Sequence, residues 1–347
     1  MTLSLKELII SHINYRDIFN APVKVSSLMQ WIGAENNEQL SESVNMHLYN
    51  LENENLIVRA KGYVAVYGKE HIIEQQQEKL ELTQRLIKKG ESTLNFMNKL
   101  PFVRYVGVSG SLAADNPTSD KDGHIDLDLF VITAQNTLWI VFLIERVITN
   151  MIRLVQKNHF YCFNYVTEEN FLEIYNKNFF TATEIKNMKT LSDDGVLDTF
   201  MSQNKWYEVY YPAVSDNPQK SVKSKLSLLS IIAWPVNYAF FALFCLGRGI
   251  KKGKLSYLKE FSSQFNPEHK CNLHRISNPN GGYQSAIQKR FERLLKSNFK
   301  NTNAQHILAN LFPGSNPKTV QESAIELVDQ KKYNSKYIIS SDEQSIN

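Results

Sequence analysis

The sequence predicts a mixed α/β protein, with an α/β core between a helical N-terminal unit and a helical C-terminal region. Three observations predict this class. The 347 residues exceed the size of one small domain. The middle of the chain alternates short β-rich runs with an apolar helix. Hydrophobic residues make up 43% and charged residues 21% of the chain, a globular balance that excludes wholesale disorder and disulfide scaffolds.

Composition and hydrophobic pattern divide the chain into five segments. They are an N-terminal domain (1–68), a connecting helix (69–100), an α/β domain (101–215), a helical C-terminal region (216–335) and a disordered tail (336–347). The three cysteines are odd in number and far apart, which favours reduced thiols in a cytoplasmic protein. The first residues lack the pattern of a signal peptide, which agrees with that location.

The N-terminal domain has the pattern of a winged helix. Apolar residues at helical spacing predict three helices, the first closed by Pro22 and the third over 38–55, and residues 56–66 then predict a β-hairpin. Winged helices read DNA through the third helix. Between Lys24 and Arg59, however, there is no Lys or Arg, while five glutamates lie there. We therefore expect a protein-contact or autoregulatory role rather than binding to duplex DNA.

Candidate catalytic residues lie next to two predicted strands of the α/β domain. The β-rich run 102–108 leads into a turn with Gly110 and Ser111, and a second, alternating run carries Asp126 and Asp128. Because side chains alternate along a strand, both carboxylates point to the same face. They repel each other unless one is protonated or a cation lies between them, and hard divalent cations prefer such oxygen ligands. The pattern therefore favours a metal site.

This order of motifs resembles the DNA polymerase β-like nucleotidyltransferase superfamily, in particular uncharacterised bacterial members with an N-terminal winged helix. The likeness covers roughly residues 1 to 212. It implies a nucleotidyltransferase-like core with a mixed sheet, in which Gly110 and Ser111 hold the triphosphate of an NTP. Asp126 and Asp128 would hold Mg²⁺ at a two-metal site. Glycine lets the backbone approach a phosphate closely, and paired metals assist phosphoryl transfer, so the residue chemistry agrees.

A third metal-binding carboxylate is the open question of this pattern. The family commonly places it on the next strand, where this chain has Asn164, with Glu168 and Glu169 just beyond it. Asparagine brings no negative charge. Three readings remain: Glu169 substitutes, Asn164 suffices as a neutral ligand, or the enzyme is impaired. Glu184 is a further candidate, although a capping box that starts at Thr181 explains it equally well.

The apolar segment 226–246 contains no charged residue and has basic residues on both sides. It is long enough to span a bilayer, but Pro235, Asn237 and the positive charge at both ends argue against a span. A helix packed on the protein and peripheral docking on a membrane are the other two readings. A His and Cys stretch at 269–274 lacks a nearby fourth zinc ligand, so we expect a loop there.

Together these patterns predict a Mg²⁺-dependent nucleotidyltransferase that moves a nucleoside monophosphate from an NTP to the hydroxyl of an unknown acceptor. The acceptor is a protein, an RNA end or a small molecule. Two alternatives stand beside this reading. One is a non-catalytic regulatory or binding protein with a degenerate nucleotidyltransferase domain, and the other is a winged-helix regulator that binds DNA.

Overall fold

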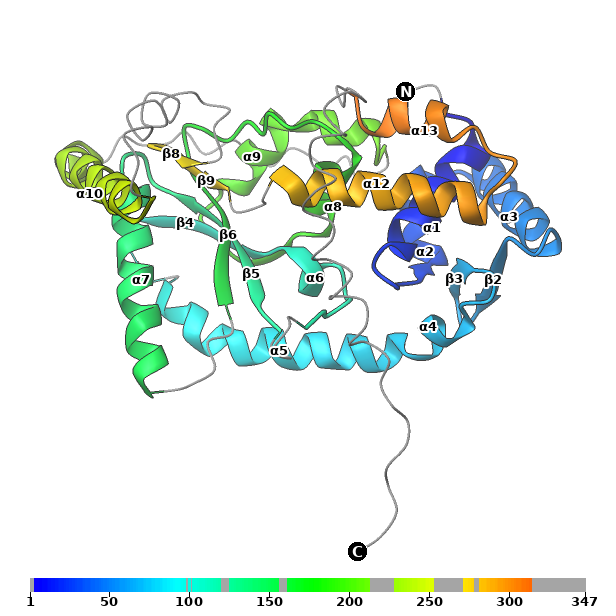
Figure 1. Ribbon diagram of the computed structural model, residues 1–347, viewed down its shortest axis with the longest axis horizontal. Coiled ribbons are helices and arrows are strands. Elements are labelled where there is room, and N and C mark those ends of the chain that lie inside the picture. Colours follow the sequence, from blue (N-terminus) through cyan, green and yellow to red (C-terminus); the bar gives the residue numbers. More distant parts are fainter. Residues whose placement is uncertain are drawn as a thin grey trace, which may run out of the picture.

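The computed structural model describes residues 3–97, 99–100, 102–119, 125–155, 161–212, 228–252, 271–277 and 281–313. These residues confirm a mixed α/β fold with one three-stranded sheet and one six-stranded mixed sheet, surrounded by helices (Figure 1). The tail predicted to be disordered (336–347) lies outside the described residues. So do parts of the predicted C-terminal region, at 216–227, 253–270, 278–280 and 314–335.

Three helices and a small antiparallel sheet form the N-terminal unit. The side chain of Ser4 caps the first helix in a capping box with Glu7, and Gly33 ends the second helix with a positive φ of 85°. The sheet order is β1-β3-β2. The elements are α1 (Leu5–Asp17), β1 (Val23–Lys24), α2 (Val25–Ile32), α3 (Glu38–Asn53), β2 (Ile57–Ala60) and β3 (Tyr63–Val66).

The connecting segment contains two helices, α4 (Glu70–Glu74) and α5 (Gln76–Met97), and α5 runs beneath the large sheet (Figure 1). The α/β domain follows. Its elements are β4 (Val103–Val108), α6 (Gly110–Ala113), β5 (Leu127–Thr133), α7 (Leu138–Val155), β6 (Tyr161–Glu168), α8 (Phe179–Asn187), β7 (Lys189–Asp193), α9 (Leu197–Gln203) and the 3₁₀ helix η1 (Lys205–Val209).

The large sheet has the order β7-β4-β5-β6-β9-β8. β4 pairs antiparallel with both β5 and β7, whereas β5 and β6 are parallel. The parallel pair is joined through α7, because parallel neighbours need a crossover connection. The sheet is therefore mixed, as the sequence predicted.

Alternation along β5 divides the core into two sides. Leu127, Leu129 and Val131 are buried in the same cluster as Trp139 of α7, on one face of the sheet. Phe130 belongs to the cluster on the opposite face, which also contains residues of α8, α9 and the N-terminal unit. Side chains two residues apart share a face, so Asp128 lies on the Phe130 side. The candidate site therefore faces away from α7.

The C-terminal region is not purely helical, so that part of the predicted organisation is wrong. Besides α10 (Leu228–Lys252), α12 (Gly281–Asn298) and α13 (Ala304–Leu311), it contains the short strands β8 (Cys271–Asn272) and β9 (Arg275–Ser277). β9 pairs antiparallel with β6 and extends the large sheet. Strands of two and three residues are too short to show an alternating pattern in the sequence.

The last helices also complete the core of the N-terminal unit. The amide nitrogen of Asn14 in α1 donates to the carbonyl of Phe291 in α12 at 2.9 Å, and Figure 1 shows α12 lying against the N-terminal helices. Phe291 and Ile307 are fully buried in the same cluster as Ile9. The described helices α12 and α13 therefore share a core with the N-terminal unit.

The helix α10 contains most of the predicted apolar segment, with Pro235 inside it. It packs against α7 on the outer side of the large sheet (Figure 1). Within the part of the chain that the structure describes, no helix combines the length and the hydropathy needed to cross a membrane.

Candidate functional site

The end of β4 places the Gly110 turn directly against the carboxylate of Asp128. The backbone N–H of Ser109 donates to the carbonyl of Asp128 at 2.8 Å, which extends the pairing of β4 and β5 by one bond. Gly110 then has a positive φ of 66° and begins α6, with Ser111 in its first turn. A Cβ atom at Gly110 would lie 2.3 Å from Oδ2 of Asp128. Only glycine fits this turn and this close approach.

The two aspartates of the Asp-x-Asp motif are close but differ in environment. Asp128 is the second residue of β5 and is partly buried, whereas Asp126 precedes the strand and is exposed. Burial raises the pKa of the Asp128 carboxyl, and the neighbouring charge of Asp126 raises it further. A hydrogen bond from Cys162 acts in the opposite direction. The expected repulsion between two carboxylates is therefore present at this strand end.

Glu184 is the carboxylate that packing brings to this turn. Its Oε2 accepts the backbone N–H of Gly110 at 3.2 Å. Burial and then the charge of Asp128 raise the pKa of Glu184 to about 7, and the Gly110 N–H opposes this rise. The capping-box explanation is wrong, because α8 begins at Phe179 and its cap is Asn178, whose Oδ1 accepts the backbone N–H of Thr181.

The neighbouring strand β6 supplies a thiol and an amide. Cys162 lies opposite Asp128 in the parallel ladder, and its Sγ donates to Oδ1 of Asp128 at 3.1 Å. Burial and the charge of Asp128 raise the pKa of the Cys162 thiol, so it is protonated and acts as a donor. The structure thus places a hydrogen-bond donor on the second carboxylate, which the sequence pattern did not indicate.

Asn164 lies at a β-bulge beside the same turn. Leu129 pairs with Phe163, but the next residue of β5 pairs with Tyr165, which leaves Asn164 as an extra residue of β6. Its side-chain nitrogen donates to Oγ of Ser109 at 3.3 Å. The structure therefore brings Asn164 to the Gly110 turn, and the contact that it makes there is with a hydroxyl.

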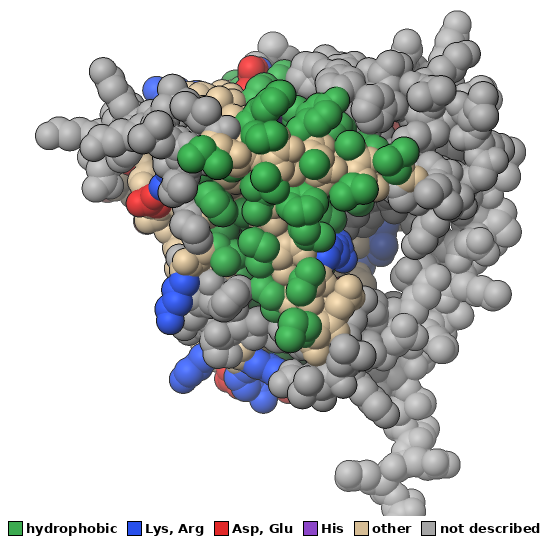
Figure 2. Space-filling view, turned by 90° about the vertical axis from the view of Figure 1, so that its left-hand side faces the viewer, with side chains coloured by type: hydrophobic (Ala, Val, Ile, Leu, Met, Phe, Trp, Pro, Cys, Tyr) green, Lys and Arg blue, Asp and Glu red, His purple; other side chains and the backbone are tan. Residues whose placement is uncertain are grey.

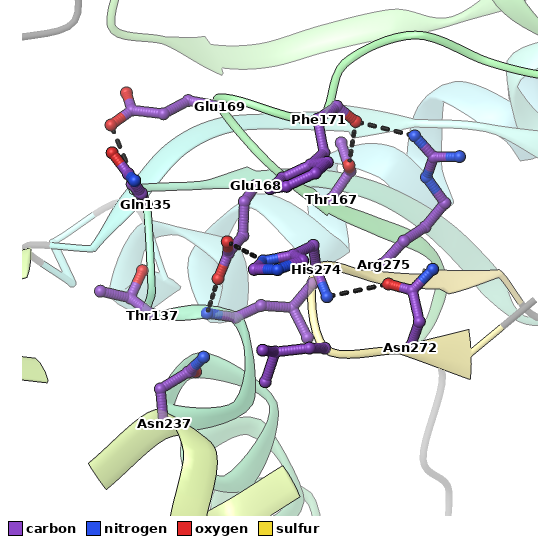
Figure 3. Close-up of polar contacts among 12 residues, drawn as sticks. Gln135, Thr137, Thr167, Glu168, Glu169, Phe171, Asn237, Asn272, His274 and Arg275 are labelled. Atoms are coloured by element: carbon purple, nitrogen blue, oxygen red, sulfur yellow. Dashed lines mark hydrogen bonds and ion pairs between the residues drawn. The ribbon is translucent and has the colours of Figure 1, made fainter. Parts of the chain in front are cut away.

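Glu169, in contrast, is not brought to Asp126 and Asp128. Asp128 lies opposite the start of β6, whereas Glu169 follows the last residue of that strand, roughly 20 Å further along. Oε1 of Glu169 accepts the backbone N–H of Gln135 at 3.2 Å, and Oε2 lies 3.5 Å from Nε of Arg104. Figure 3 shows this carboxylate pointing toward Gln135.

Glu168 belongs to a second polar cluster, at the start of α7 (Figure 3). It is fully buried, and its Oε2 lies 2.8 Å from Nδ1 of His274. Its Oε1 accepts the backbone N–H of Leu138 at 3.4 Å, while Oδ1 of Asn237 accepts that of Trp139 at 2.7 Å. Glu168 and Asn237 thus satisfy two N–H groups of the first turn of α7, which is a structural role.

A basic residue from an unpredicted strand also reaches the short helix. Lys189 of β7 lies opposite Val108, and its Nζ forms an ion pair with Asp115 and lies 3.4 Å from the carbonyl of Leu112. No sequence signal marked this residue, because β7 itself has no clear alternation. Lys189 is a positive charge close to the turn that resembles a phosphate-binding motif.

The donor chemistry of the site fits a hard cation only in part. Asp126, Asp128 and Glu184 offer the oxygen ligands that Mg²⁺ prefers. Among the residues that the structure describes, however, no three His, Cys, Asp or Glu side chains are arranged as a metal-ligand group. The expectation that Asp126 and Asp128 hold a metal therefore stays a prediction.

Comparison of the chain with family models, with curated proteins and with solved structures finds no match. A function for this fold has to rest on its site, since a fold alone does not determine an activity.

Proposed function

We propose that this protein is a Mg²⁺-dependent nucleotidyltransferase, which moves a nucleoside monophosphate from an NTP to an acceptor hydroxyl. One observation carries the proposal. The backbone of Gly110 lies against Asp128 so closely that a Cβ atom would overlap the carboxylate. This contact supports the proposal because it would bring the turn that binds phosphate and the strand that binds metal together in one site, as transfer of a phosphoryl group requires.

The charges around Gly110 support a cation-dependent activity. Asp128 and Glu184 both have a raised pKa for which a neighbouring carboxylate is one cause. A divalent cation held by Asp126 and Asp128 would remove this repulsion. Bound Mg²⁺ would supply charge neutralisation at the phosphates during transfer. The chain's own contribution is to hold the two carboxylates and the turn in a fixed relation.

The triphosphate would bind at Gly110 and Ser111, close to the positive charge of Lys189. In the present arrangement Glu184 accepts the Gly110 N–H, which is the donor that a phosphate oxygen would use. An incoming phosphate therefore competes with Glu184 for this N–H. Because the pKa of Glu184 is raised to about 7, protonation of this carboxyl near neutral pH weakens it as an acceptor and assists that exchange.

The test is a double variant, Asp126→Asn with Asp128→Asn, in a transfer assay. Purified protein, labelled NTP and Mg²⁺ are incubated with cell extract, and label is followed in protein, RNA and small-molecule fractions. We expect label with the natural chain and none with the variant. The control is Glu35→Gln with Glu38→Gln, which removes two exposed carboxylates of the N-terminal unit and should leave labelling unchanged. Labelling by a folded Asp126 and Asp128 double variant would refute the proposal.

A second function, a non-catalytic regulatory module, is favoured by two contacts of the same site. Glu184 already accepts the Gly110 N–H, which a phosphate would need. Cys162 already donates to the carboxylate of Asp128, which a metal ion would need. Calorimetry separates the two functions. The natural chain is titrated with ATP, GTP, CTP and UTP in the presence of Mg²⁺. Binding of one of them supports the transferase, and binding of none supports the regulator.

The N-terminal unit has the element order expected for a winged helix, yet its charges favour a protein contact over DNA. Arg59, one of the few basic residues on its hairpin, donates through Nε to Glu52 at 2.8 Å. The exposed side of α3 carries the apolar side chains of Met46 and Tyr49. A mobility-shift titration with duplex DNA at physiological salt should show no binding, and a shift would support the DNA-binding alternative.

A further inference from the structure

An exposed apolar surface covers the outer side of α7 and α10, far from the candidate site. Figure 2 shows it as a broad, nearly continuous group of hydrophobic side chains. Trp234 is 52% and Leu243 61% exposed. We call this surface the α7–α10 face; its most exposed side chains are Val147, Met151, Ile232, Trp234, Leu243 and Leu246. Contiguous apolar patches of this kind mark interaction sites in proteins.

The face exists because α10 has no charged residue over 228–246 but is buried on only one side. Ala233, Asn237, Phe241 and Cys245 are buried, and their spacing of four residues makes one stripe along the helix that packs toward α7. A helix that is apolar all round is expected to be surrounded by apolar matter. Phe244 also packs on the rings of Trp139 and Phe142, whereas Ile232, Trp234, Leu243 and Leu246 of α10 remain exposed.

The sequence that flanks this face is basic, and the described residues of α7 and α10 include no exposed Asp or Glu. Residues 228–252 include no Asp or Glu, and the one acidic residue of α7, Glu145, is buried and accepts a hydrogen bond from Thr149 at 2.7 Å. Arg146 is half exposed; its Nε lies 3.3 Å from Oε2 of Glu145, and its guanidinium lies 4.9 Å from the ring of Phe142. An apolar surface that basic residues flank in the sequence is complementary to a bilayer that contains anionic lipids.

The position of these charges also disfavours a second copy of the chain as the occupant. Lys223 and Lys225 precede α10, and Arg248, Lys251 and Lys252 lie at its end in the sequence. In a two-fold symmetric dimer the same surface meets itself. Because both ends of the helix are basic, like charges would meet in either the parallel or the antiparallel arrangement. Anionic lipid headgroups would instead attract these basic residues.

Exposed aromatic rings add the chemistry of a membrane interface. The rings of Trp234 and Tyr238 lie one turn apart on α10 and stack with their centroids 6.0 Å apart, and both side chains are exposed. Tryptophan and tyrosine are enriched at the headgroup level of membranes, where an apolar ring with a polar atom fits best. We propose that the α7–α10 face docks peripherally on a membrane surface that contains anionic lipids.

Docking in this orientation leaves the candidate site accessible. Asp128 lies on the face of the sheet that is turned toward α8, while α7 and α10 cover the opposite face. The protein thus presents Gly110 and Glu184 away from the bilayer. The proposal does not depend on the transferase activity, because the two surfaces are separate.

Sedimentation with vesicles tests the proposal. The full-length chain is mixed with vesicles of phosphatidylcholine and phosphatidylglycerol in a 7:3 ratio, as roughly typical of anionic membranes, or with phosphatidylcholine alone. We expect binding to the anionic vesicles that weakens at least about tenfold without phosphatidylglycerol. Trp234→Glu with Leu243→Glu should weaken binding at least about tenfold, because two inserting side chains become charged. The matched control, Met46→Glu with Tyr49→Glu on α3, changes the net charge equally and should bind like the natural chain.

Fluorescence quenching by acyl chains labelled with bromine locates the contact. Vesicles with these lipids should quench the tryptophan emission of the natural chain, and Trp234→Phe should abolish most of the quenching while sedimentation persists. Three results would overturn the proposal. They are no sedimentation of the natural chain with anionic vesicles, equal binding of the Trp234 and Leu243 double variant, or a dimer in light scattering that this variant dissociates while no vesicles are bound.

Discussion

Replacing Gly110 by alanine measures how tightly the turn and the Asp-x-Asp strand are packed together. The added Cβ would lie 2.3 Å from Oδ2 and 3.1 Å from Cγ of Asp128, so the carboxylate or the turn has to move. Moving the carboxylate breaks its hydrogen bond with Cys162. Overpacking of this kind costs about 1–3 kcal/mol. A left-handed backbone, with φ of 66°, costs alanine about 1–2 kcal/mol more.

The control for the backbone part of this cost is Gly62→Ala. Gly62 also has a positive φ, 76°, but nothing lies within 4 Å of a Cβ atom there. This variant therefore experiences the backbone strain without the collision. We expect a loss in the free energy of unfolding of about 1–2 kcal/mol for Gly62→Ala and about 2–5 kcal/mol for Gly110→Ala.

Urea unfolding followed by tryptophan fluorescence measures both variants, and a double-mutant cycle isolates the collision. Asp128→Ala removes Oδ2 and Cγ, so Gly110→Ala should cost about 1–3 kcal/mol less in that background. Equal losses for Gly110→Ala and Gly62→Ala, or a cycle with no coupling, would show that the close packing of Gly110 on Asp128 is not a property of the folded protein.

Two further predictions concern Glu184 and Asn237. The pKa of Glu184 is raised to about 7 in the folded protein, so its contribution to stability is present below about pH 4.5 and is lost as the pH rises through 7. In urea unfolding, the free energy of unfolding of Glu184→Gln should equal that of the natural chain at pH 4.5 and exceed it by about 1–3 kcal/mol at pH 8. Parallel pH profiles of the two proteins would contradict this prediction. Asn237→Leu removes the acceptor of the Trp139 N–H and should lower the free energy of unfolding by about 1–3 kcal/mol, whereas Asn237→Asp keeps an acceptor. Equal thermal stability of the two variants would exclude a role of Asn237 as the acceptor for the start of α7.

Local patterns predicted most of the elements that form the candidate site. The alternation around Asp126 and Asp128 indicated which face of a strand the carboxylates share, and the structure has Leu127 and Leu129 in the core on the other face. Gly110 also lies where the motif predicted, at the beginning of a short helix. These features depend on neighbours a few residues away, which a single sequence displays directly.

The remaining parts of the site depend on contacts between distant residues. Glu184 reaches the turn only because α8 packs near α6, and it is 74 positions away from Gly110. Asn164, which donates to Ser109, is itself the extra residue of a bulge in β6, and periodicity cannot reveal such a bulge. The charge of Glu169 favours a metal ligand, but its position just after β6 decides its neighbours. Long-range packing and register are therefore the physical limits of the sequence prediction.

The packing of α12 on α1 has a consequence for how the chain is made. Asn14 and Phe291 are 277 positions apart, so at roughly 5–20 residues per second a ribosome needs roughly 14–55 s between them. During that interval Ile9 and Ile13, which are buried in the finished protein, lack the C-terminal helices that complete their core. The N-terminal unit is thus synthesised before α12 but can complete its core only after α12 has been made, so its apolar side chains stay exposed during that interval.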